Sequence, residues 1–377
     1  MSNLFRTRKL QLNWVKADFA CKRKIALLIP QYNEYSKGDF VDRLRYFRQL
    51  SVQFKDYIDV IIIDDGSTDN SLATIQSFIA SDEESFSVAS VFPNGNKVGA
   101  LSAVSEAIVH DFIVLSDFDT DLSGLKELIC RIGDSTSDDF EMGYYFRMLP
   151  FGGKGPIFQF QQLEYCFARI LYKFHEKDKS VPVMPGAGCC FRRDVLNAIY
   201  RTHSGLRNGE DREATLIGFR MGYSVSYLDN VLALTRPPMT YRNLVVQRIR
   251  WNLGYLETLL FERKYYVSQI FKLSRMGVRT LYDICCVLFV VLLPLLLAFL
   301  FVGSKYSVLV ILAAYLLFLV WSFFLIRISP RESAEFKNKI IETVLLYPII
   351  VVAVDYVAWI GALLRFAKRN YSQLKRN

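Results

Sequence analysis

The sequence predicts an α/β protein with a doubly wound, mixed but mostly parallel sheet, followed by transmembrane helices in the C-terminal part. Two observations lead to this prediction. Between residues 23 and 240, short apolar runs alternate with helical patterns, and beyond residue 280 the chain becomes almost continuously apolar. Hydrophobic residues make up 52% of the 377 residues, which is high for a soluble protein, and the excess lies in this C-terminal part.

Four short runs in the first part are predicted to be buried parallel strands. They are mostly apolar and rich in β-branched residues, as strands covered on both faces usually are. The predicted strands are 25–29, 58–63, 88–92 and 112–115.

Helical patterns separate these strands. Phe40, Leu44 and Phe47 recur at helical spacing, and segments 71–79 and 98–109 give two further helices. This alternation predicts a sheet whose ligands bind at the carboxyl ends of its strands.

The C-terminal part contains three apolar runs. Residues 284–304 and 306–326 hold no charged residue, and each run is long enough for a membrane-spanning helix, which needs about 20 apolar residues. A third run, 343–364, is interrupted only by Pro348 and Asp355. If all three runs crossed, the basic tail would lie outside, against the positive-inside rule. We therefore expect two to three crossings. Pro348 and Asp355 would suit a third segment that packs in a bundle or enters the bilayer only partway, and whether it spans stays open.

The net charge of +9 is consistent with nucleic-acid binding or with an anionic membrane. Lysine and arginine gather around the apolar C-terminal part, which favours the anionic cytoplasmic leaflet. No apolar stretch of signal-peptide length follows the N-terminal basic residues. The expectation is a multi-pass protein of a bacterial inner or plasma membrane that binds no nucleic acid and keeps its α/β domain in the cytosol. Whether a partner membrane subunit completes it stays open.

Polar clusters follow three of the predicted strands. These clusters are Gln31 to Glu34, Asp64 with Asp65, and Asp117 with Asp119. Because the carboxyl ends of parallel strands meet at one edge of a sheet, we expect the three clusters to lie together.

Asp64 and Asp65 begin an Asp-Asp-Gly-Ser-Thr-Asp segment with two interpretations. Short polar side chains after a strand are common in turns and helix caps. Alternatively, Asp65 accepts a hydrogen bond from the imide of a uracil while Asp64 supports the strand end, because a base donor calls for a carboxylate opposite it.

Asp117 and Asp119 are candidate ligands of a hard divalent cation. Two carboxylates separated by one residue can hold such an ion and leave coordination sites for phosphate oxygens. A helix cap involving Thr120 and Asp121 is the structural alternative. Lys97 lies between the clusters in sequence and is either a point charge for a diphosphate or an ordinary surface lysine.

Glu210 and Asp211 precede a predicted helix, where the helix dipole alone would favour two acids. A group transfer to a hydroxyl needs a carboxylate to remove the acceptor proton, and Asp211 is the candidate for this general base. Glu210 is expected to orient it or to contact the acceptor.

Gln247, Arg250 and Trp251 are spaced so that they share one face of a helix, for which Thr240 is a plausible N-cap. One interpretation is an anchor at the membrane interface, where Trp and Arg are common. The other places Trp251 against an acceptor sugar and Arg250 at a departing diphosphate.

In their order, these motifs resemble those of family 2 glycosyltransferases. The resemblance covers residues 22–255 and is carried by five segments in sequence order. They are Ile29-Pro30-Gln31-Tyr32-Asn33-Glu34, Asp64-Asp65-Gly66-Ser67, Asp117-Phe118-Asp119, Glu210-Asp211 and Gln247-Arg248-Ile249-Arg250-Trp251. The last one is similar to the QxxRW motif of hyaluronan, chitin and cellulose synthases and of ceramide glucosyltransferases.

The resemblance implies a GT-A fold, a UDP-sugar donor, Mg²⁺ or Mn²⁺, and inversion at the anomeric carbon without a covalent intermediate. By the same resemblance Asp119 and Asp117 bind the metal, Asp211 is the base, and Gly186 lies in a loop near the acceptor. Gln247, Arg250 and Trp251 are expected at the acceptor and the diphosphate. The nucleotide-sugar site is expected to comprise Pro30, Tyr32, Glu34, Asp64, Asp65, Lys97 and Asp117.

Three functions remain open. The QxxRW-like motif favours building a β-linked polysaccharide or oligosaccharide on a saccharide acceptor. The absence of membrane helices before the α/β domain, which most polysaccharide synthases of this family have, favours a single addition to a glycolipid or polyprenyl-linked acceptor. A non-catalytic membrane partner is the third alternative, although every expected carboxylate is present.

The expected organisation has five parts. They are an N-terminal cytosolic segment (1–22), a catalytic domain (23–240), interfacial helices (241–280), two to three transmembrane helices (281–365) and a basic tail (366–377). Within the catalytic domain, the amphipathic stretch 157–174 is either an interfacial helix or a core helix, since both have the same pattern.

Overall fold

The computed structural model describes residues 9–19, 24–81, 86–134, 140–303, 306–328 and 334–374. The chain divides into two compact units. We call residues 1–148 and 179–235 the sheet unit, and residues 149–178 and 236–377 the helical unit. The sequence suggested one catalytic domain over 23–240, whereas by compactness segment 149–178 belongs with the C-terminal helices.

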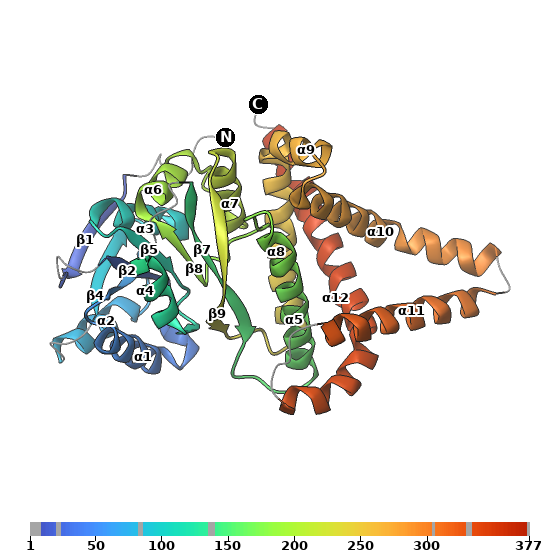
Figure 1. Cartoon of the computed structure of the whole chain (residues 1–377), viewed down its shortest axis with the longest axis horizontal. Helices are drawn as coiled ribbons and strands as arrows, with labels where there is room; N and C mark the ends of the chain where they lie inside the picture. Colours follow the sequence, from blue (N-terminus) through green and yellow to red (C-terminus); the bar gives the residue numbers. More distant parts are fainter. Residues whose placement is uncertain are drawn as a thin grey trace. The chain divides into compact units, whose positions relative to one another are not determined.

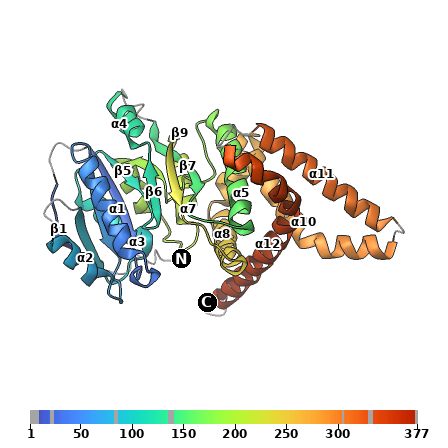
Figure 2. The same ribbon diagram turned by 90° about the horizontal axis from the view of Figure 1, so that it is seen from below.

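The sheet unit is built on a nine-stranded mixed sheet with the order β1-β4-β3-β2-β5-β8-β7-β9-β6 (Figures 1 and 2). The strands are β1 (Gln11–Lys16), β2 (Ile25–Gln31), β3 (Ile58–Asp64), β4 (Ser87–Phe92), β5 (Phe112–Leu115), β6 (Thr120–Ser123), β7 (Glu141–Pro150), β8 (Cys189–Arg192) and β9 (Ser224–Thr235). The helices of this unit are α1 (Phe40–Gln53), α2 (Ser71–Ala80), α3 (Asn96–Ala107), α4 (Leu125–Asp134), α6 (Arg193–Thr202) and α7 (Glu210–Arg220), with a short 3-10 helix at Tyr35–Lys37.

The mixed α/β sheet and its four predicted strands are confirmed. Strands β4, β3, β2 and β5 pair in parallel, and their bounds agree with the predicted runs to within two residues. The rest of the sheet is antiparallel at the pairings β1 to β4, β8 to β5, β7 to β8 and β6 to β9. The sheet is therefore mixed, as predicted, but a smaller share of its strand pairs is parallel than we expected.

One antiparallel strand lies in the segment expected to precede the catalytic domain. Residues 11–16 form β1, which pairs with β4 at the end of the sheet. Its side chains are exposed or half-buried, so this edge strand lacks the continuous apolar run that reveals a buried strand in a sequence. The N-terminal boundary at residue 22 thus divides the sheet unit.

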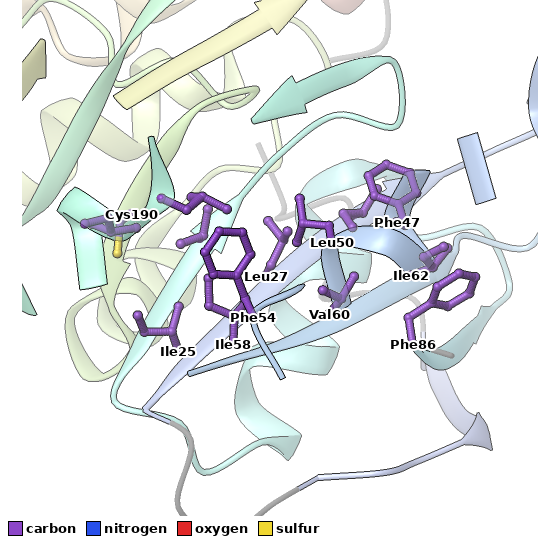
Figure 3. Packing of buried hydrophobic residues seen from close by; sticks show 14 of the residues in the cluster. Ile25, Leu27, Phe47, Leu50, Phe54, Ile58, Val60, Ile62, Phe86 and Cys190 are labelled. Carbon is purple, nitrogen blue, oxygen red and sulfur yellow. The ribbon is translucent and has the colours of Figure 1, made fainter. Parts of the chain in front are cut away.

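The core of the sheet unit follows from the alternation of side chains along each strand. Leu27, Val60 and Ile62 point to the face covered by α1, whose Phe47 and Leu50 lie over them (Figure 3). Strand residues of the opposite parity, such as Leu28 and Ile61, are also fully buried, and α3 contacts β2 and β3. Burial on both sides fixes the register, because a one-residue slip would reverse every side chain.

The helical unit comprises α5 (Pro156–Glu176), α8 (Tyr241–Phe261), α9 (Arg263–Phe271), α10 (Arg275–Gly303), α11 (Ser307–Ile328) and α12 (Ala334–Leu374). Phe160 and Leu163 of α5 pack with Ile249 of α8 and with Tyr347 and Val354 of α12 in one apolar cluster. The amphipathic stretch 157–174 is therefore a core helix of this unit. As expected, Thr240 caps α8, its hydroxyl accepting a hydrogen bond from the amide of Asn243 at 3.3 Å.

Three helices of this unit are long and apolar enough to cross a membrane. The candidate spans are Arg275–Leu296, Ser307–Phe324 and Val344–Arg369. Each overlaps one of the apolar runs found in the sequence. Figures 1 and 2 show α10 and α11 leaving the α5, α8 and α12 bundle as a hairpin.

Candidate functional site

The carboxyl ends of β2, β3 and β5 bring the predicted polar clusters together. Gln31 at the end of β2 is in register with Asp64 at the end of β3, and its side-chain amide donates to the Asp64 carboxylate. These segments line a cavity of about 220 Å³. Its lining residues are Pro30, Gln31, Tyr32, Glu34, Asp65, Lys97, Asp117, Phe118 and Asp119.

Asp64 supports the strand end, as one of its two interpretations predicted. Its carboxylate accepts from the side chain of Gln31 and from the amide of Ser67 at 3.2 Å, and it is buried. Burial raises the pKa of Asp64, and the hydrogen bonds from Ser67 oppose the rise. Asp64 is not among the residues that line the cavity, and its predicted role in nucleotide binding stays a prediction.

Asp65 lines the cavity with a carboxylate held in a fixed orientation. One oxygen accepts from the amide of Gly95 at 2.7 Å and the other from the Asn94 side chain at 3.0 Å. A carboxylate oxygen can accept more than one hydrogen bond. The hydrogen bonds also join the end of β3 to the turn before α3.

The segment after β2 is held by a second set of hydrogen bonds. Asn33 has a left-handed backbone with φ of 54°, and its side-chain oxygen accepts from the amide of Thr68 at 2.8 Å. Tyr32 is 43% exposed, and Glu34 pairs with Lys37 at 2.6 Å. Tyr32 and Glu34 therefore reach the cavity from a tethered loop.

Asp117 and Asp119 line the same cavity and differ in their partners. Asp117 forms an ion pair with Lys97. Nothing among the described residues donates a hydrogen bond to the Asp119 carboxylate, and burial together with the nearby Asp117 charge raises its pKa. The half-buried Asp119 is thus the carboxylate that gains most from a cation.

The donor set fits a divalent metal that arrives with a diphosphate. Within the described ranges there is no group of three or more His, Cys, Asp or Glu able to hold an ion alone. Mg²⁺ is usually bound through one or two carboxylates together with substrate phosphates and water. Asp119 and Asp117, two residues apart at the cavity wall, are the carboxylates placed for this role, and metal binding by them stays a prediction.

Lys97 connects the two halves of the site. Its ammonium pairs with Asp117 and donates to the Gly186 carbonyl at 3.4 Å. Burial alone would lower the pKa of Lys97, but the carboxylates of Asp117, Glu210 and Asp211 hold it above its usual range. Lys97 is therefore a permanently charged member of the site and not a surface lysine.

Asp211 and Glu210 begin α7, as the sequence predicted, and lie on the other side of Lys97. The Asp211 carboxylate accepts from its neighbour Arg212 at 2.8 Å and from the amide of Gly186 at 3.4 Å. Burial, and then the charge of Asp211, raise the pKa of Glu210 to about 7. A second cavity, of about 20 Å³, is lined by Lys97, Gly186, Glu210 and Asp211 together with apolar side chains.

Sequence reasoning missed Arg43, which holds the segment carrying Asp119. This buried arginine of α1 donates to the carbonyls of Phe118 at 2.7 Å and Thr120 at 2.8 Å, and pairs with Asp121. Its guanidinium also lies over the Phe47 ring, 4.9 Å from the centroid. The only signal in the sequence is an arginine on the apolar face of α1.

A buried network before α7 was also missed. The ring of His203 donates through Nε2 to the Glu210 carbonyl at 2.9 Å and accepts through Nδ1 from the amide of Gly205 at 3.0 Å. The Glu213 carboxylate accepts from the amide and the hydroxyl of Ser204. These hydrogen bonds hold the loop that leads into Glu210 and Asp211.

Gln247, Arg250 and Trp251 belong to α8 of the helical unit. Trp251 is 47% exposed, and the guanidinium of Arg248 lies over its ring, 4.3 Å from the centroid. Arg248 also pairs with Glu164 of α5. The arginine that orders Trp251 is therefore Arg248, which the motif did not single out, and the acceptor-side roles of Gln247, Arg250 and Trp251 stay predictions.

Two family models match the chain. "Glycosyl transferase family 2" matches residues 26–200, and "Glycosyl transferase family group 2" matches residues 157–326. A search of curated proteins gave no significant match.

Several solved structures are similar to the chain. A mannosyltransferase from Pyrobaculum calidifontis, in complex with GDP-Man and Mn²⁺, is 13% identical, with 94% of this chain and 90% of that chain covered and a TM-score of 0.57. S. aureus TarS 1-349 in complex with UDP-GlcNAc is 13% identical, with 93% and 92% covered and a TM-score of 0.41. Glucosyl-3-phosphoglycerate synthase from Mycobacterium tuberculosis, in complex with Mn²⁺, UDP and glucosyl-3-phosphoglycerate, is 15% identical, with 63% and 80% covered and a TM-score of 0.40.

Together the family models and the first of these structures define the class of the chain. It is a family 2 glycosyltransferase whose mixed α/β sheet has the GT-A fold, followed by three long apolar helices. This confirms the predicted fold class and the predicted family, whereas membership of the QxxRW branch stays a prediction.

Proposed function

We propose that this protein is an inverting, metal-dependent glycosyltransferase that moves a sugar from a UDP-sugar to a saccharide acceptor at a membrane and builds a β-linked oligosaccharide or polysaccharide. The observation that carries the proposal is the row of charged groups at the strand ends. Asp65, Asp117 and Asp119 line one cavity, and Lys97 joins that cavity to Asp211 and Glu210.

Asp65 is the proposed contact for the base. Its carboxylate lines the cavity and is oriented by Gly95 and Asn94. A uracil offers one imide N–H, whereas a guanine offers a ring N–H and an exocyclic amino group, so the choice of nucleotide is tested by comparing UDP with GDP. Pro30, Tyr32 and Glu34 line the same cavity and are proposed to surround the nucleoside.

Asp119 and Asp117 are the proposed metal ligands, with Mg²⁺ or Mn²⁺ as the ion. Bound there, the ion would neutralise charge on the leaving diphosphate. Lys97 supplies a second positive charge next to Asp117. Because this lysine also faces Glu210 and Asp211, it stabilises the site before the donor arrives.

Asp211 is the proposed general base. Its place at the start of α7, beside Gly186, leaves it across Lys97 from the carboxylates assigned to the donor. A base on that side removes the proton of the acceptor hydroxyl while the hydroxyl attacks the anomeric carbon opposite the diphosphate, which inverts the configuration. Glu210, whose pKa is raised to about 7, is proposed to contact the acceptor as a neutral acid for part of the time.

A lipid-linked acceptor is the second candidate. The exposed apolar helices α10 and α11 favour it, because they would place the enzyme where glycolipid or polyprenyl-linked acceptors are found. Incubating membranes with labelled UDP-sugars and sizing the products separates the two. Products extended by many sugars support the saccharide polymer, and one or two sugars on an extractable lipid support the alternative.

The central experiment compares two substitutions with a matched control. Asp211→Asn should keep the affinity for UDP and Mn²⁺ and lose turnover by about 10²-fold or more, the usual scale for a general base. Asp119→Ala should lose metal-dependent UDP binding measured by calorimetry. Asp194→Asn, at the start of α6 with its side chain 62% exposed, is the control and should change neither quantity.

The opposite results identify what is wrong. Full turnover in Asp211→Asn would remove the base assignment. A wild-type protein without turnover, whose function in the cell is unchanged by Asp211→Asn, would favour a non-catalytic membrane partner. Tighter binding of GDP than of UDP would mean that the donor is a GDP-sugar. The proposed metal ligands and the proposed base would be unaffected.

A further inference from the structure

Helices α8 and α12 of the helical unit run parallel to each other with a constant offset in sequence. The hydroxyl of Tyr241 donates to the carbonyl of Ala353 at 3.0 Å, 112 residues further on. Glu257 forms an ion pair with Arg369, again 112 residues further on. Between these two contacts, Gly361 faces Ile249, and a Cβ on this glycine would lie 2.8 Å from the Cδ1 atom of Ile249.

This register covers much of the third candidate membrane span. The span is Val344–Arg369, and residues 353–369 of it lie alongside residues 241–257 of α8. Any orientation of this part of α12 relative to a membrane is therefore shared by α8.

Helix α8 is too polar to accompany a helix through a bilayer. Arg242, Asn243 and Arg250 are exposed on it. Arginine near the middle of a bilayer is strongly unfavourable, and exposed arginines on a span would have no protein partner there. Residues 353–369 consequently do not cross the hydrocarbon, although their composition alone would allow it.

The charged residue of the third span is consistent with this placement. The charge of Arg248 of α8, the arginine that also pairs with Glu164, acts on Asp355. Burial, and next the charge of Asp355, raise the pKa of Glu164 to about 7, against the opposing effect of Arg248. The acid within the apolar run therefore has its partner inside the helical unit and not in a second membrane helix.

The other face of α12 is apolar and uncovered. Its docked face buries Val344, Val354, Ala358 and Ala362. At helical spacing these positions lie opposite a row of side chains that are 44–67% exposed. The row consists of Leu345, Leu346, Ile349, Val352, Val357 and Leu364.

What covers this apolar face of α12 is indicated by α10 and α11, which have the same kind of surface. Both helices belong to the same unit and expose large apolar side chains along their length, among them Phe299, Leu309 and Leu317. Arg365 and Lys368 follow the apolar row within the C-terminal part of α12 and are exposed, as is common where a helix meets anionic headgroups.

We propose that α12 lies in the plane of the membrane interface, with its apolar row against the acyl chains, and that only the hairpin of α10 and α11 crosses the bilayer. The chain then makes two crossings. The basic tail returns to the side on which α8 lies, and only five residues, 236–240, separate α8 from β9 of the sheet unit. This topology satisfies the positive-inside rule, which three crossings would violate.

The test measures the depth of spin labels in the full-length protein reconstituted in vesicles of mixed neutral and anionic lipids. Single cysteines replace Leu345, Ile349, Val352, Val357 and Leu364 in a background without reactive native cysteines. Labels on an in-plane helix should all lie about 5–10 Å below the headgroups. A spanning helix would separate the first and last labels by roughly 28 Å along the membrane normal, at 1.5 Å per residue.

The matched control is α11, whose exposed positions Leu309, Leu312, Leu316 and Val320 should give the steep depth profile of a crossing helix. A profile on α12 that is deepest near Val352 and shallow at both ends would overturn the proposal. So would a flat profile on α11, because the hairpin would then not cross.

A second measurement needs no substitution in the fold. The chain is fused at residue 377 to a fluorescent protein that matures only in the cytosol, or to a phosphatase that is active only outside. Fluorescence without phosphatase activity supports two crossings, and phosphatase activity contradicts them. Neither result depends on glycosyl transfer, so the proposal can fail while the proposed function stands.

Discussion

Arg43 offers the sharpest test of how the candidate metal site is held. Its guanidinium binds the carbonyls on both sides of Asp119 and the carboxylate of Asp121 from a buried position. Replacement by Met keeps the packing volume and removes all the donors. Removing one partner of a buried ion pair costs about 3–5 kcal/mol. Here the loss of Arg43 leaves the carbonyls of Phe118 and Thr120 without their donor, together with an Asp121 side chain that is 22% exposed.

The matched control lies on the same helix. Arg45 pairs with Asp42 one turn away, and both side chains are more than 60% exposed. An exposed pair of this kind contributes about 0–1 kcal/mol, so Arg45→Met should be almost neutral. Arg43→Lys keeps one charge without the planar guanidinium fork and should fall between the two.

The assay combines unfolding with hydrogen exchange. Arg43→Met should lower the melting temperature of the sheet unit by roughly 6–20 °C, from about 2–4 °C per kcal/mol for a unit of this size. Amides of residues 116–123 should exchange faster well below that temperature, and UDP should bind more weakly in the presence of Mn²⁺. If melting, exchange and binding all match those of Arg45→Met, the inference that Arg43 positions Asp119 is wrong.

Two further substitutions test the packing and the electrostatics of the sheet unit. Glu210→Gln should raise stability more at pH 8 than at pH 5. The pKa of Glu210 is about 7 in the folded state and 4.5 in its usual, unfolded environment. Between these two pH values the folded state keeps a proton that the unfolded state loses, so the stability of the wild-type protein falls as the pH rises from about 4.5 to 7. A difference in melting temperature that is independent of pH would refute this sign. Gly143→Ala should cost more than about 3 kcal/mol or prevent folding, because Gly143 has φ of +152° and a Cβ would lie 1.9 Å from the Cys190 carbonyl oxygen. Gly133→Ala, in the open on α4, should be neutral or stabilising in the same thermal assay.

Local pattern was enough for the parallel half of the sheet and for the site at its edge. The runs that became β2, β3 and β5 are buried on both faces, and such strands are continuously apolar whatever surrounds them. Strand polarity then places Asp65, Asp117 and Asp119 at one edge, since parallel strands end together. The convergence of these acids on one cavity was predictable for that reason.

Other features depend on partners that are distant in sequence. The strand β1 and the role of Arg43 have no local signal, because an edge strand is half-exposed and an arginine on a helix looks the same whether its partner is water or the carbonyl of Phe118. Segment 149–178 joins the helical unit through contacts made with residues beyond 236.

The sequence by itself determined the family, the order of the motifs, the predicted strands and the apolar length of the last three helices. Only the tertiary structure decided which carboxylates are already paired, which one at the cavity has no hydrogen-bond donor among the described residues, and which apolar helix lies against a polar neighbour. The physical reason is the separation along the sequence of the residues that interact. Hydrophobic periodicity depends on residues a few positions apart, whereas the partner of Asp117 is 20 residues away and that of Glu257 is 112 residues away.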